Sequence, residues 1–569
     1  MSRAFSSLDW SILICYIATI STIGSLFYRK RTSAAEYFLG GRSLRALPVA
    51  LSLVAADMSA ITYMGTPAWS YQHNLEEFWT TCSYVLVAPI VMYFILPFFM
   101  RFKFYTAYEY LQRRFDLRTR LVVSGLFLLM RGSHVAIAIY APSIVLSLLT
   151  GFPLYLSVLV IGLFTTFYTT LGGMKAVIWT DVLQFSILLT GMLAVFWLSL
   201  SRIPGGVHTV YAVAGQAGRL RLWNFSFNPD ELTAFWPAVI GGGVMVLATL
   251  GTDQAYLQRY FATRNLREGR RSIFMDACVL VPVNLVLFLL GPVLYTFYTC
   301  YPGRLQGLPR MDAILPFFVL HELGGVFSGL VIASIFASSM AVMSSGINAL
   351  TTATTVDFYR GWLRQGASDS HYVTIGRWGT VAWGTLTTFG ALFAARLGPL
   401  INAFNKINSF LGGPILGIFL LGMLSRRAKG KAAVAGGVVA LIAVASIAAT
   451  TNISFFYYAL IGVLITLGVG YLLSLPGKPP NPALLFGLVR GLGTQSTTSN
   501  TLLGSARVAV SRKGSAAPMR ALTSFGSKEN NPLTPRISAR SILRAGLGRF
   551  CSRAEASTPN ADELPPLLN

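Results

Sequence analysis

Residues 51–71, L-S-L-V-A-A-D-M-S-A-I-T-Y-M-G-T-P-A-W-S-Y, form an apolar stretch long enough to cross a lipid bilayer. Asp57 lies near its middle among small and hydroxyl residues, and Gly65 and Pro67 weaken a helix further along. Unwound backbone survives at membrane depth only where protein or a watery cavity covers it. The stretch therefore predicts a broken transmembrane helix whose free carbonyls line an ion and solute site. A kinked but complete helix, with Asp57 satisfied by a neighbour, is the alternative.

The composition is that of a polytopic all-α membrane protein, because 54% of the 569 residues are hydrophobic and only 12% are charged. Soluble domains carry roughly 25% charged residues. The five cysteines are scattered singly and indicate neither a disulfide framework nor a zinc site. Apolar runs of about 20 residues predict about thirteen membrane helices, with each broken helix counted once. The runs lie at residues 8–28, 46–72, 79–100, 119–149, 153–172, 178–201, 233–254, 273–299, 321–356, 374–395, 399–424, 432–450 and 454–474.

Basic residues are concentrated in alternate loops, for example at residues 29–31, 101–120, 259–271 and 426–431. By the positive-inside rule this pattern predicts a multi-pass plasma-membrane protein with its N-terminus outside and its C-terminus in the cytoplasm. The net charge of +24 therefore reports topology, and a nucleic-acid partner is not expected. Residues 476–569 are rich in Ser, Pro, Gly and Arg without periodicity, which predicts a disordered basic cytoplasmic tail.

A second interrupted run extends from Trp236 to Tyr260 and carries three consecutive glycines followed by Gly251-Thr252-Asp253-Gln254. It comes about five helices after the first, and both runs hold a carboxylate. This matched pair is typical of an inverted-repeat transporter with helices 2–6 and 7–11 as its halves; independent packing glycines are the alternative. We expect a first helix and cytoplasmic loop at 1–45, the transporter core at 46–425, two further helices at 426–475 and the tail at 476–569.

Other charged residues interrupt the apolar runs. Asp181 lies near the cytoplasmic start of helix 6, where it either sits in the headgroup region or acts as an inner relay for a cation or proton. Arg131 and Lys406 are expected deep in helices 4 and 11 and need partners, whereas His134 is more often a packing histidine. The candidate partners are Asp57, Asp181, Asp253 and an anionic substrate.

Helix 9 is the most polar long run, from Ser334 to Tyr359, with hydroxyls that recur at helical spacings. Such hydroxyls usually bond to their own backbone or hold helices together. A cluster this dense is also able to bind a hard cation, which prefers oxygen ligands. The hydroxyls in question belong to Ser338, Ser345, Thr352 and Thr355.

Seven motifs make the chain resemble the sodium/solute symporter family, whose members use a LeuT-type fold of two inverted five-helix repeats. The resemblance covers roughly residues 8–475 and not the tail. In chain order the motifs are Glu36 to Arg42, Ala55 to Ser59, Tyr105 to Leu111, Leu171 to Asp181, Thr252 to Gln254 with Gln258-Arg259, Ser345 to Leu350, and Phe410 to Pro414.

The resemblance implies a sodium site built from carbonyls of Ala55, Met58 and Ser338 and from two adjacent hydroxyls of helix 9. The positions that match the hydroxyl pair are Ala341 and Val342, which have no side-chain oxygen. Either neighbouring serines (Ser338-Ser339 or Ser344-Ser345) replace them, or the site is incomplete. Asp57 and Asp181 match family carboxylates, which leaves weak sodium binding or proton coupling open.

The family's sugar-binding glutamine and lysine correspond here to Thr62 and Val279, which argues against a sugar as substrate. The run Gly65 to Ala68 is similar to the monocarboxylate, vitamin and iodide branch, and Arg131 would balance an anion. A small organic anion is therefore favoured. The residues expected to line its site are Thr62, Thr66, Thr252, Gln254 and Arg131.

The function expected is secondary active transport, with sodium-coupled symport of a small organic solute by alternating access. Proton-coupled or uncoupled transport by the same fold is the first alternative, and a transporter-derived membrane sensor is the second. No nucleophile–base pair, metal cluster or phosphate loop indicates an enzyme. No cofactor is expected beyond sodium as the coupling ion, and the expected partners are the solute, Na⁺ or H⁺, and the bilayer.

Overall fold

The computed structural model describes residues 7–26, 33–323, 326–394, 396, 398–476 and 485. Contacts divide the chain into Met1–Thr497 and Thr498–Asn569, and all described residues belong to the first unit. The predicted tail, apart from residues 476 and 485, lies outside the described residues. Within the described residues the first unit is helical, and its one β feature is an isolated bridge between Leu44 and Thr263. The expected all-α class is confirmed.

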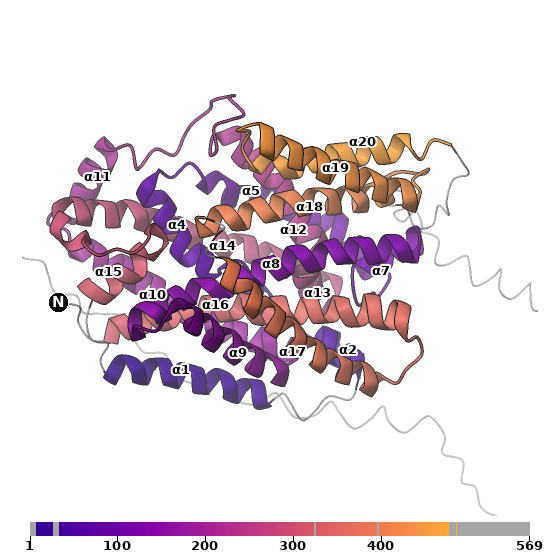
Figure 1. The fold of residues 1–569 in the computed structure, drawn as a ribbon, viewed down its shortest axis with the longest axis horizontal. Helices are drawn as coiled ribbons and strands as arrows, with labels where there is room; N and C mark the ends of the chain where they lie inside the picture. The colour runs from indigo at the N-terminus through magenta and orange to yellow at the C-terminus, as the bar shows by residue number, and fades with distance from the viewer. Residues whose placement is uncertain are drawn as a thin grey trace, which may run out of the picture. The chain divides into compact units, whose positions relative to one another are not determined.

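The α-helices follow one another in a bundle (Figure 1). α2, α7 and α13 lie toward one end of this bundle, and α11 and α15 toward the other. Their bounds are α1 Ser7–Leu26, α2 Ala34–Leu39, α3 Ala46–Asp57, α4 Ala60–Gln72, α5 Phe78–Ile90, α6 Leu96–Met100, α7 Tyr108–Arg114, α8 Leu117–Thr150, α9 Leu154–Leu171, α10 Met174–Ser201, α11 Gly206–Gln216, α12 Gly242–Thr252, α13 Gln254–Phe261, α14 Leu266–Cys300, α15 Ile314–Glu322, α16 Val326–Ala353, α17 Asp369–Ala394, α18 Leu400–Leu424, α19 Gly430–Thr450 and α20 Phe456–Leu472.

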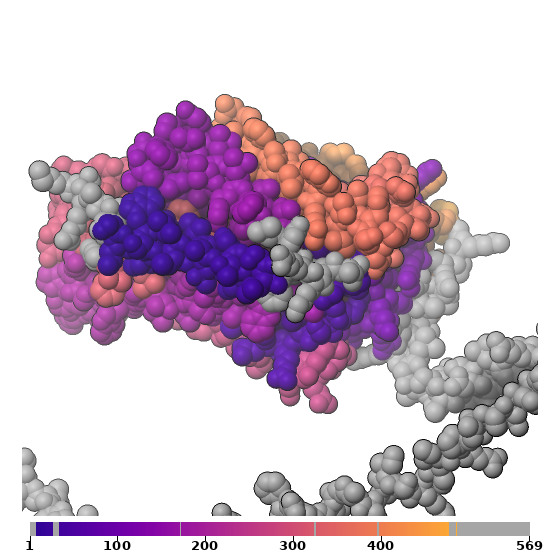
Figure 2. All heavy atoms as spheres, turned by 90° about the horizontal axis from the view of Figure 1, so that it is seen from below, coloured from indigo at the N-terminus to yellow at the C-terminus, as the bar shows by residue number. Residues whose placement is uncertain are grey.

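Among the described residues, eight helices are long and apolar enough to cross a membrane, and two bent helix pairs bring the number to 10. α9 and α20 are shorter apolar helices. The run expected at 374–395 corresponds to α17, which is not among the helices that are both long and apolar enough to cross a membrane. The protein is thus a multi-pass membrane protein. Its most enclosed span begins with α16, which packs against α8 and α10. α1 lies on the surface of the bundle against α16 (Figure 2).

The two bent pairs are the two helices expected to be broken. α3 and α4 meet at 55°. The π-helical turn Pro237–Gly241 continues into α12, and this segment meets α13 at 49°. At the first break Met58 leaves the helical region, and the Ser59 hydroxyl then accepts a bond from the Thr62 amide at 3.3 Å. At the second break the Asp253 carboxylate accepts from the Ala255 amide at 2.7 Å. In both cases an N-capping side chain starts the second half of the helix.

The weakening expected at Gly65 and Pro67 is wrong, because both residues lie inside the continuous helix α4. Pro67 has no N–H to donate to the carbonyl of Tyr63, one turn earlier, but the helix continues through it. Gly65 instead allows close packing, since a Cβ there would lie 3.3 Å from the Ile401 Cβ. The interruption is therefore confined to Asp57–Ser59.

Candidate solute and cation sites

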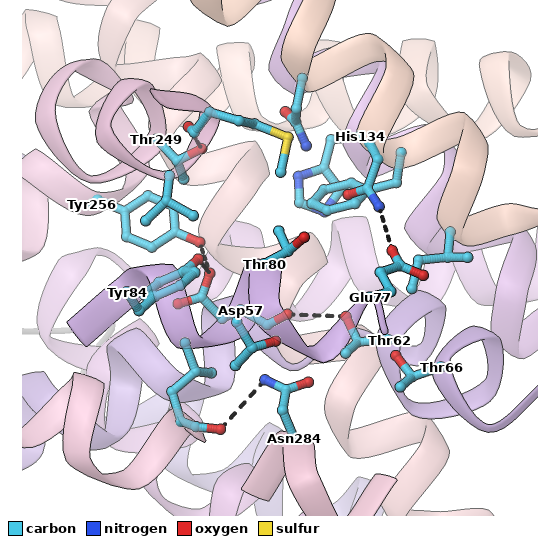
Figure 3. A pocket seen from close by; sticks show the side chains of 18 of the residues that line it. Asp57, Thr62, Thr66, Glu77, Thr80, Tyr84, His134, Thr249, Tyr256 and Asn284 are labelled. Atoms are coloured by element: carbon cyan, nitrogen blue, oxygen red, sulfur yellow. Dashed lines mark hydrogen bonds between the residues drawn. The ribbon is translucent and has the colours of Figure 1, made fainter. Parts of the chain in front are cut away.

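A cavity of about 100 Å³ lies beside both breaks (Figure 3). Eight helices supply its walls, namely α3, α4, α5, α8, α12, α13, α14 and α18, so that parts of both predicted repeats face one space. The lining residues are Asp57, Thr62, Thr66, Glu77, Thr80, Thr81, Tyr84, Arg131, His134, Met245, Val246, Thr249, Tyr256, Leu280, Asn284, Phe288, Ile401, Phe404, Asn405 and Asn408.

Asp57 connects the first break to the second. Its Oδ1 accepts a hydrogen bond from the Tyr84 hydroxyl of α5 at 3.0 Å and another from the Tyr256 hydroxyl of α13. Figure 3 shows both phenols pointing at the carboxylate. Its Oδ2 is buried and has no hydrogen-bond partner. The carboxylate is therefore held in place by two elements and still has one oxygen free for a ligand.

Arg131 has the carboxylate partner that a buried cation requires. Its Nη1 lies 3.4 Å from Asp253 Oδ2, and both side chains are 2% exposed. The same nitrogen lies 3.1 Å from His134 Nδ1. Nε and Nη2 of Arg131 and Nε2 of His134 have no partner. His134 packs on Phe404, with ring centroids 4.5 Å apart, but it also lines the cavity and is thus more than the expected packing residue.

The deep position expected for Lys406 is wrong. This residue is exposed on α18 rather than buried, because its helix packs into the bundle through a different face and a lysine stem can run along an apolar surface to reach water. Of the described cations, Arg131 is the one that faces the cavity.

Three of the five residues expected to line the solute site do so, namely Thr62, Thr66 and Arg131. Thr252 and Gln254 do not line the cavity. The Thr252 hydroxyl donates within its helix to Ala248 at 2.7 Å. The Gln254 amide bonds the loop before α7, where it accepts from the Ala107 amide at 3.2 Å and donates to the Tyr105 carbonyl at 2.8 Å. The Gln254 side chain therefore joins the second break to a loop, whereas the Thr252 side chain stays within its own helix.

Sequence reasoning missed several polar lining residues. Glu77 directly precedes an apolar run, where an acidic residue usually complements the helix dipole, so no sequence signal separated it from a surface residue. Asn284 is a single polar residue within an apolar run, whereas Tyr84 and Asn405 stand in runs with several polar residues that nothing in the sequence ranks. Only their convergence on one cavity identifies them.

The carbonyl positions matched to the sodium site lie at the first break. The amide of Ser59 donates to the Asp57 carbonyl at 3.0 Å and not to the Ala55 carbonyl, its helical acceptor in an unbroken helix. Ala55 and Met58 therefore lie where helical pairing stops. An opening of this kind frees carbonyl oxygens for a cation.

The positions of helix 9 that match the sodium site lie on α16 and provide few side-chain oxygens for a cation. Ala341 and Val342 are fully buried and carry no hydroxyl. The hydroxyls of Ser338, Ser344 and Ser345 donate to carbonyls of their own helix at 2.8, 3.2 and 3.1 Å, and the Ser339 hydroxyl donates to the Ala138 carbonyl. Each of these oxygens keeps lone pairs as an acceptor, but none replaces the missing pair in register.

Asp181 is fully buried on α10, inside the bundle and not on its outer surface. Its Oδ2 lies 2.9 Å from Arg259 Nη2 and accepts from the Ser52 hydroxyl at 2.5 Å. Its Oδ1 has no partner. Asp181 thus joins α10 to α13 and α3 and retains one free oxygen.

Two broken helices that meet at one cavity with charged and hydroxyl lining residues define a secondary transporter of the inverted-repeat, LeuT-type fold. The chain belongs to the Sodium:solute symporter family, whose model matches residues 37–440.

Relatives of known name agree with this assignment. The chain is 31% identical to the sodium/sialic acid symporter NanT of Aliivibrio fischeri, over 83% of this chain and 94% of the relative. It is 33% identical to the sodium-coupled monocarboxylate transporter 1 of Homo sapiens, over 71% of this chain and 66% of the relative.

Solved structures support the fold. The substrate-bound outward-open state of a Na⁺-coupled sialic acid symporter has a TM-score of 0.78 and 27% identity, covering 84% of this chain and 99% of that one. Mhp1, a nucleobase-cation-symport-1 family transporter in a closed conformation, has a TM-score of 0.53 at 12% identity, which supports the fold alone.

Proposed function

We propose that this protein is a plasma-membrane symporter that moves a small organic solute together with Na⁺ by alternating access. The observation that carries the proposal is Asp57, which lies at the first break and is hydrogen-bonded to Tyr256 of the second. A cation or solute that binds beside Asp57 therefore acts on both halves of the fold at once. The family, which is made up of transporters, supports the same conclusion.

The solute is proposed to carry a carboxylate. Arg131 lines the cavity and its Nη2 has no hydrogen-bond partner, and a guanidinium is well suited to binding a carboxylate. Named relatives are symporters of sialic acid and of monocarboxylates. Thr62 and Thr66 would supply hydroxyl contacts to the same solute.

Sodium is proposed to bind at the opened carbonyls of Ala55 and Met58 with a carbonyl near Ser338, close to the carboxylates Asp57 and Asp181. We further propose that the basic loops are cytoplasmic, which puts the N-terminus outside and the C-terminus inside. The domain limits at residues 45, 425 and 475, drawn from the apolar runs and the change of composition, remain proposals.

Proton-coupled or uncoupled transport is the second candidate, and Ala341 and Val342 favour it. Without two hydroxyl ligands, a sodium ion in a low-dielectric site keeps fewer oxygens in exchange for its lost hydration. Weaker sodium binding than in a complete site is expected on this account.

Uptake into proteoliposomes tests both candidates. Labelled pyruvate, lactate, proline, galactose and sialic acid are each supplied with an inward sodium gradient, an inward proton gradient, or neither. Accumulation that requires sodium supports the symport proposal. Accumulation that requires protons, or that ignores both gradients, contradicts sodium coupling and supports the second candidate.

The double variant Ala341→Ser/Val342→Ser tests the sodium site directly. Restoring two oxygens should lower the sodium concentration for half-maximal uptake about tenfold, since a hydrogen bond or ligand contact to a charged group contributes about 1.5–3 kcal/mol. Ala349→Ser, on the same helix and equally buried, is the matched control and should change nothing. An unchanged sodium dependence in the double variant would argue against these positions as ligands.

A further inference from the structure

Glu77 is a buried carboxylate to which neither the family match nor the cation site gives a role. It directly precedes α5, lines the cavity and is 4% exposed. Its Oε1 accepts one hydrogen bond, from Asn405 Nδ2 of α18 at 3.0 Å, and its Oε2 has no partner. Although Glu77 occupies the N-cap position of α5, its side chain makes no capping bond.

No described basic side chain lies within 4.0 Å of the Glu77 carboxylate, so Glu77 forms no ion pair with a described residue. The preceding residue, Glu76, differs sharply, because its Oε1 lies 2.5 Å from Arg221 Nε. A buried carboxylate with a single amide donor is costly unless a cation joins it or a proton neutralises it. Either a ligand supplies the positive charge to Glu77, or Glu77 is a neutral structural link to α18.

The remaining lining favours a ligand. Figure 3 shows Glu77 and Asp57 on opposite sides of the cavity. Asp57 already accepts two phenol hydrogen bonds, and one of these phenols, Tyr256, lies under the Arg131 guanidinium at 5.8 Å. Tyr256 thus contacts both Asp57 and Arg131, and Glu77 is the less compensated carboxylate.

The cavity is lined by Arg131, whose Nη2 has no partner, and by Glu77, whose Oε2 has none, with apolar walls from Phe288, Ile401 and Phe404. A simple carboxylate would meet Arg131 favourably but would be repelled by Glu77. A solute with a carboxylate and a protonated amine satisfies both groups, because unlike charges attract most strongly in a desolvated site.

We propose that the transported solute is a small zwitterion of the amino-acid type, with its carboxylate at Arg131 and its ammonium group at Glu77 Oε2. This assignment rests on the proposed transport function and narrows its substrate class. It excludes solutes that are only anionic as the preferred cargo.

Equilibrium binding to the purified full chain in nanodiscs with sodium tests the assignment with molecules that share one skeleton. L-proline carries both charges, cyclopentanecarboxylate only the negative charge and pyrrolidine only the positive charge; L-alanine, lactate and ethylamine repeat the comparison on an open chain. We expect at least one zwitterion to bind at least tenfold more tightly than both of its singly charged partners. Equal or tighter binding of the anion-only partners, or binding of no zwitterion, overturns the proposal.

The variant Glu77→Gln separates a charged binding group from a neutral structural link. The glutamine oxygen still accepts the Asn405 bond, so the contact between α5 and α18 remains. We expect zwitterion affinity to fall at least tenfold and the preference over the anion to be lost, whereas Glu76→Gln, the adjacent control, keeps both. Zwitterion affinity within twofold of wild type in Glu77→Gln overturns the proposal.

Uptake by the same protein in proteoliposomes distinguishes this proposal from the transport function. Zwitterion binding without uptake contradicts transport and leaves the ligand class standing. Sodium-driven uptake of lactate in preference to alanine, unaffected by Glu77→Gln, supports transport and overturns the ligand class.

Discussion

Removing one partner of the ion pair between Arg120 and Asp357 should strongly destabilise the bundle. Arg120 Nη2 lies 2.6 Å from Asp357 Oδ1, and the two side chains are 7% and 0% exposed. The Thr106 and Ser124 hydroxyls donate to the same carboxylate at 2.6 and 2.9 Å. Asp357 lies in the π-helical segment Thr354–Leu363, which continues α16. The pair and its hydroxyl donors therefore join this segment to α8 and to the loop before α7.

The expected loss in Asp357→Asn follows from this geometry. Two unit charges 2.6 Å apart attract by roughly 6 kcal/mol at an effective dielectric constant of about 20, which is an upper bound because solvation is lost. Removing one partner of a buried pair costs about 3–5 kcal/mol, since the other charge stays buried and unpaired. We expect the free energy of unfolding to fall by about 3–5 kcal/mol by this reasoning.

Steric trapping in bicelles measures this free energy without removing the protein from a bilayer-like environment. Glu322→Gln is the control, because its partner Arg304 is 51% exposed and a surface ion pair contributes about 0–1 kcal/mol. The double variant Arg120→Gln/Asp357→Asn should be less destabilised than the sum of its single variants. A loss in Asp357→Asn no larger than that in Glu322→Gln would refute the reasoning.

Two further substitutions probe the site. Gly291→Ala would place a Cβ 2.1 Å from the Ser70 hydroxyl and 2.6 and 2.7 Å from two backbone atoms of α4. The resulting overpacking should lower the free energy of unfolding by about 1–3 kcal/mol and slow uptake. Gly125→Ala, whose Cβ would have nothing within 4 Å, should leave stability and uptake unchanged. Equal unfolding temperatures for the two alanine variants would contradict this. Tyr256→Phe removes one of the two donors to Asp57. A charged hydrogen bond contributes about 1.5–3 kcal/mol, so the KM for solute should rise at least tenfold, and an unchanged KM would show that the bond matters little to binding.

The broken helices could be predicted from sequence, but the place of the first break could not be deduced from its glycine and proline. The break lies at Met58, and Ser59 caps the helix that follows, whereas Pro67 lies inside the continuous helix α4. Capping is local and readable. Tolerance of a proline depends on tertiary neighbours, which a single sequence does not reveal.

The charged residues show the same limit. The sequence predicts that a buried arginine in helix 4 needs a carboxylate, but several partners fit, and only the fold selects Asp253 for Arg131. Lys406 was placed inside because its run is apolar, yet the exposed side of a membrane helix is equally apolar. Glu77 gave no signal, since its burial depends on α18, far along the chain.

The charges at the two breaks explain why this fold would need a cation. Asp253 is paired with Arg131 and Asp181 with Arg259. Asp57 has phenol donors but no basic side chain within 4.0 Å among the described residues. It is also adjacent to the backbone opened at Met58. A monovalent cation at this point would neutralise Asp57 and use the opened carbonyls. Because Tyr256 binds the same carboxylate from the second repeat, the arrival of that charge would be felt in both halves, which is the physical requirement for coupling an ion to alternating access.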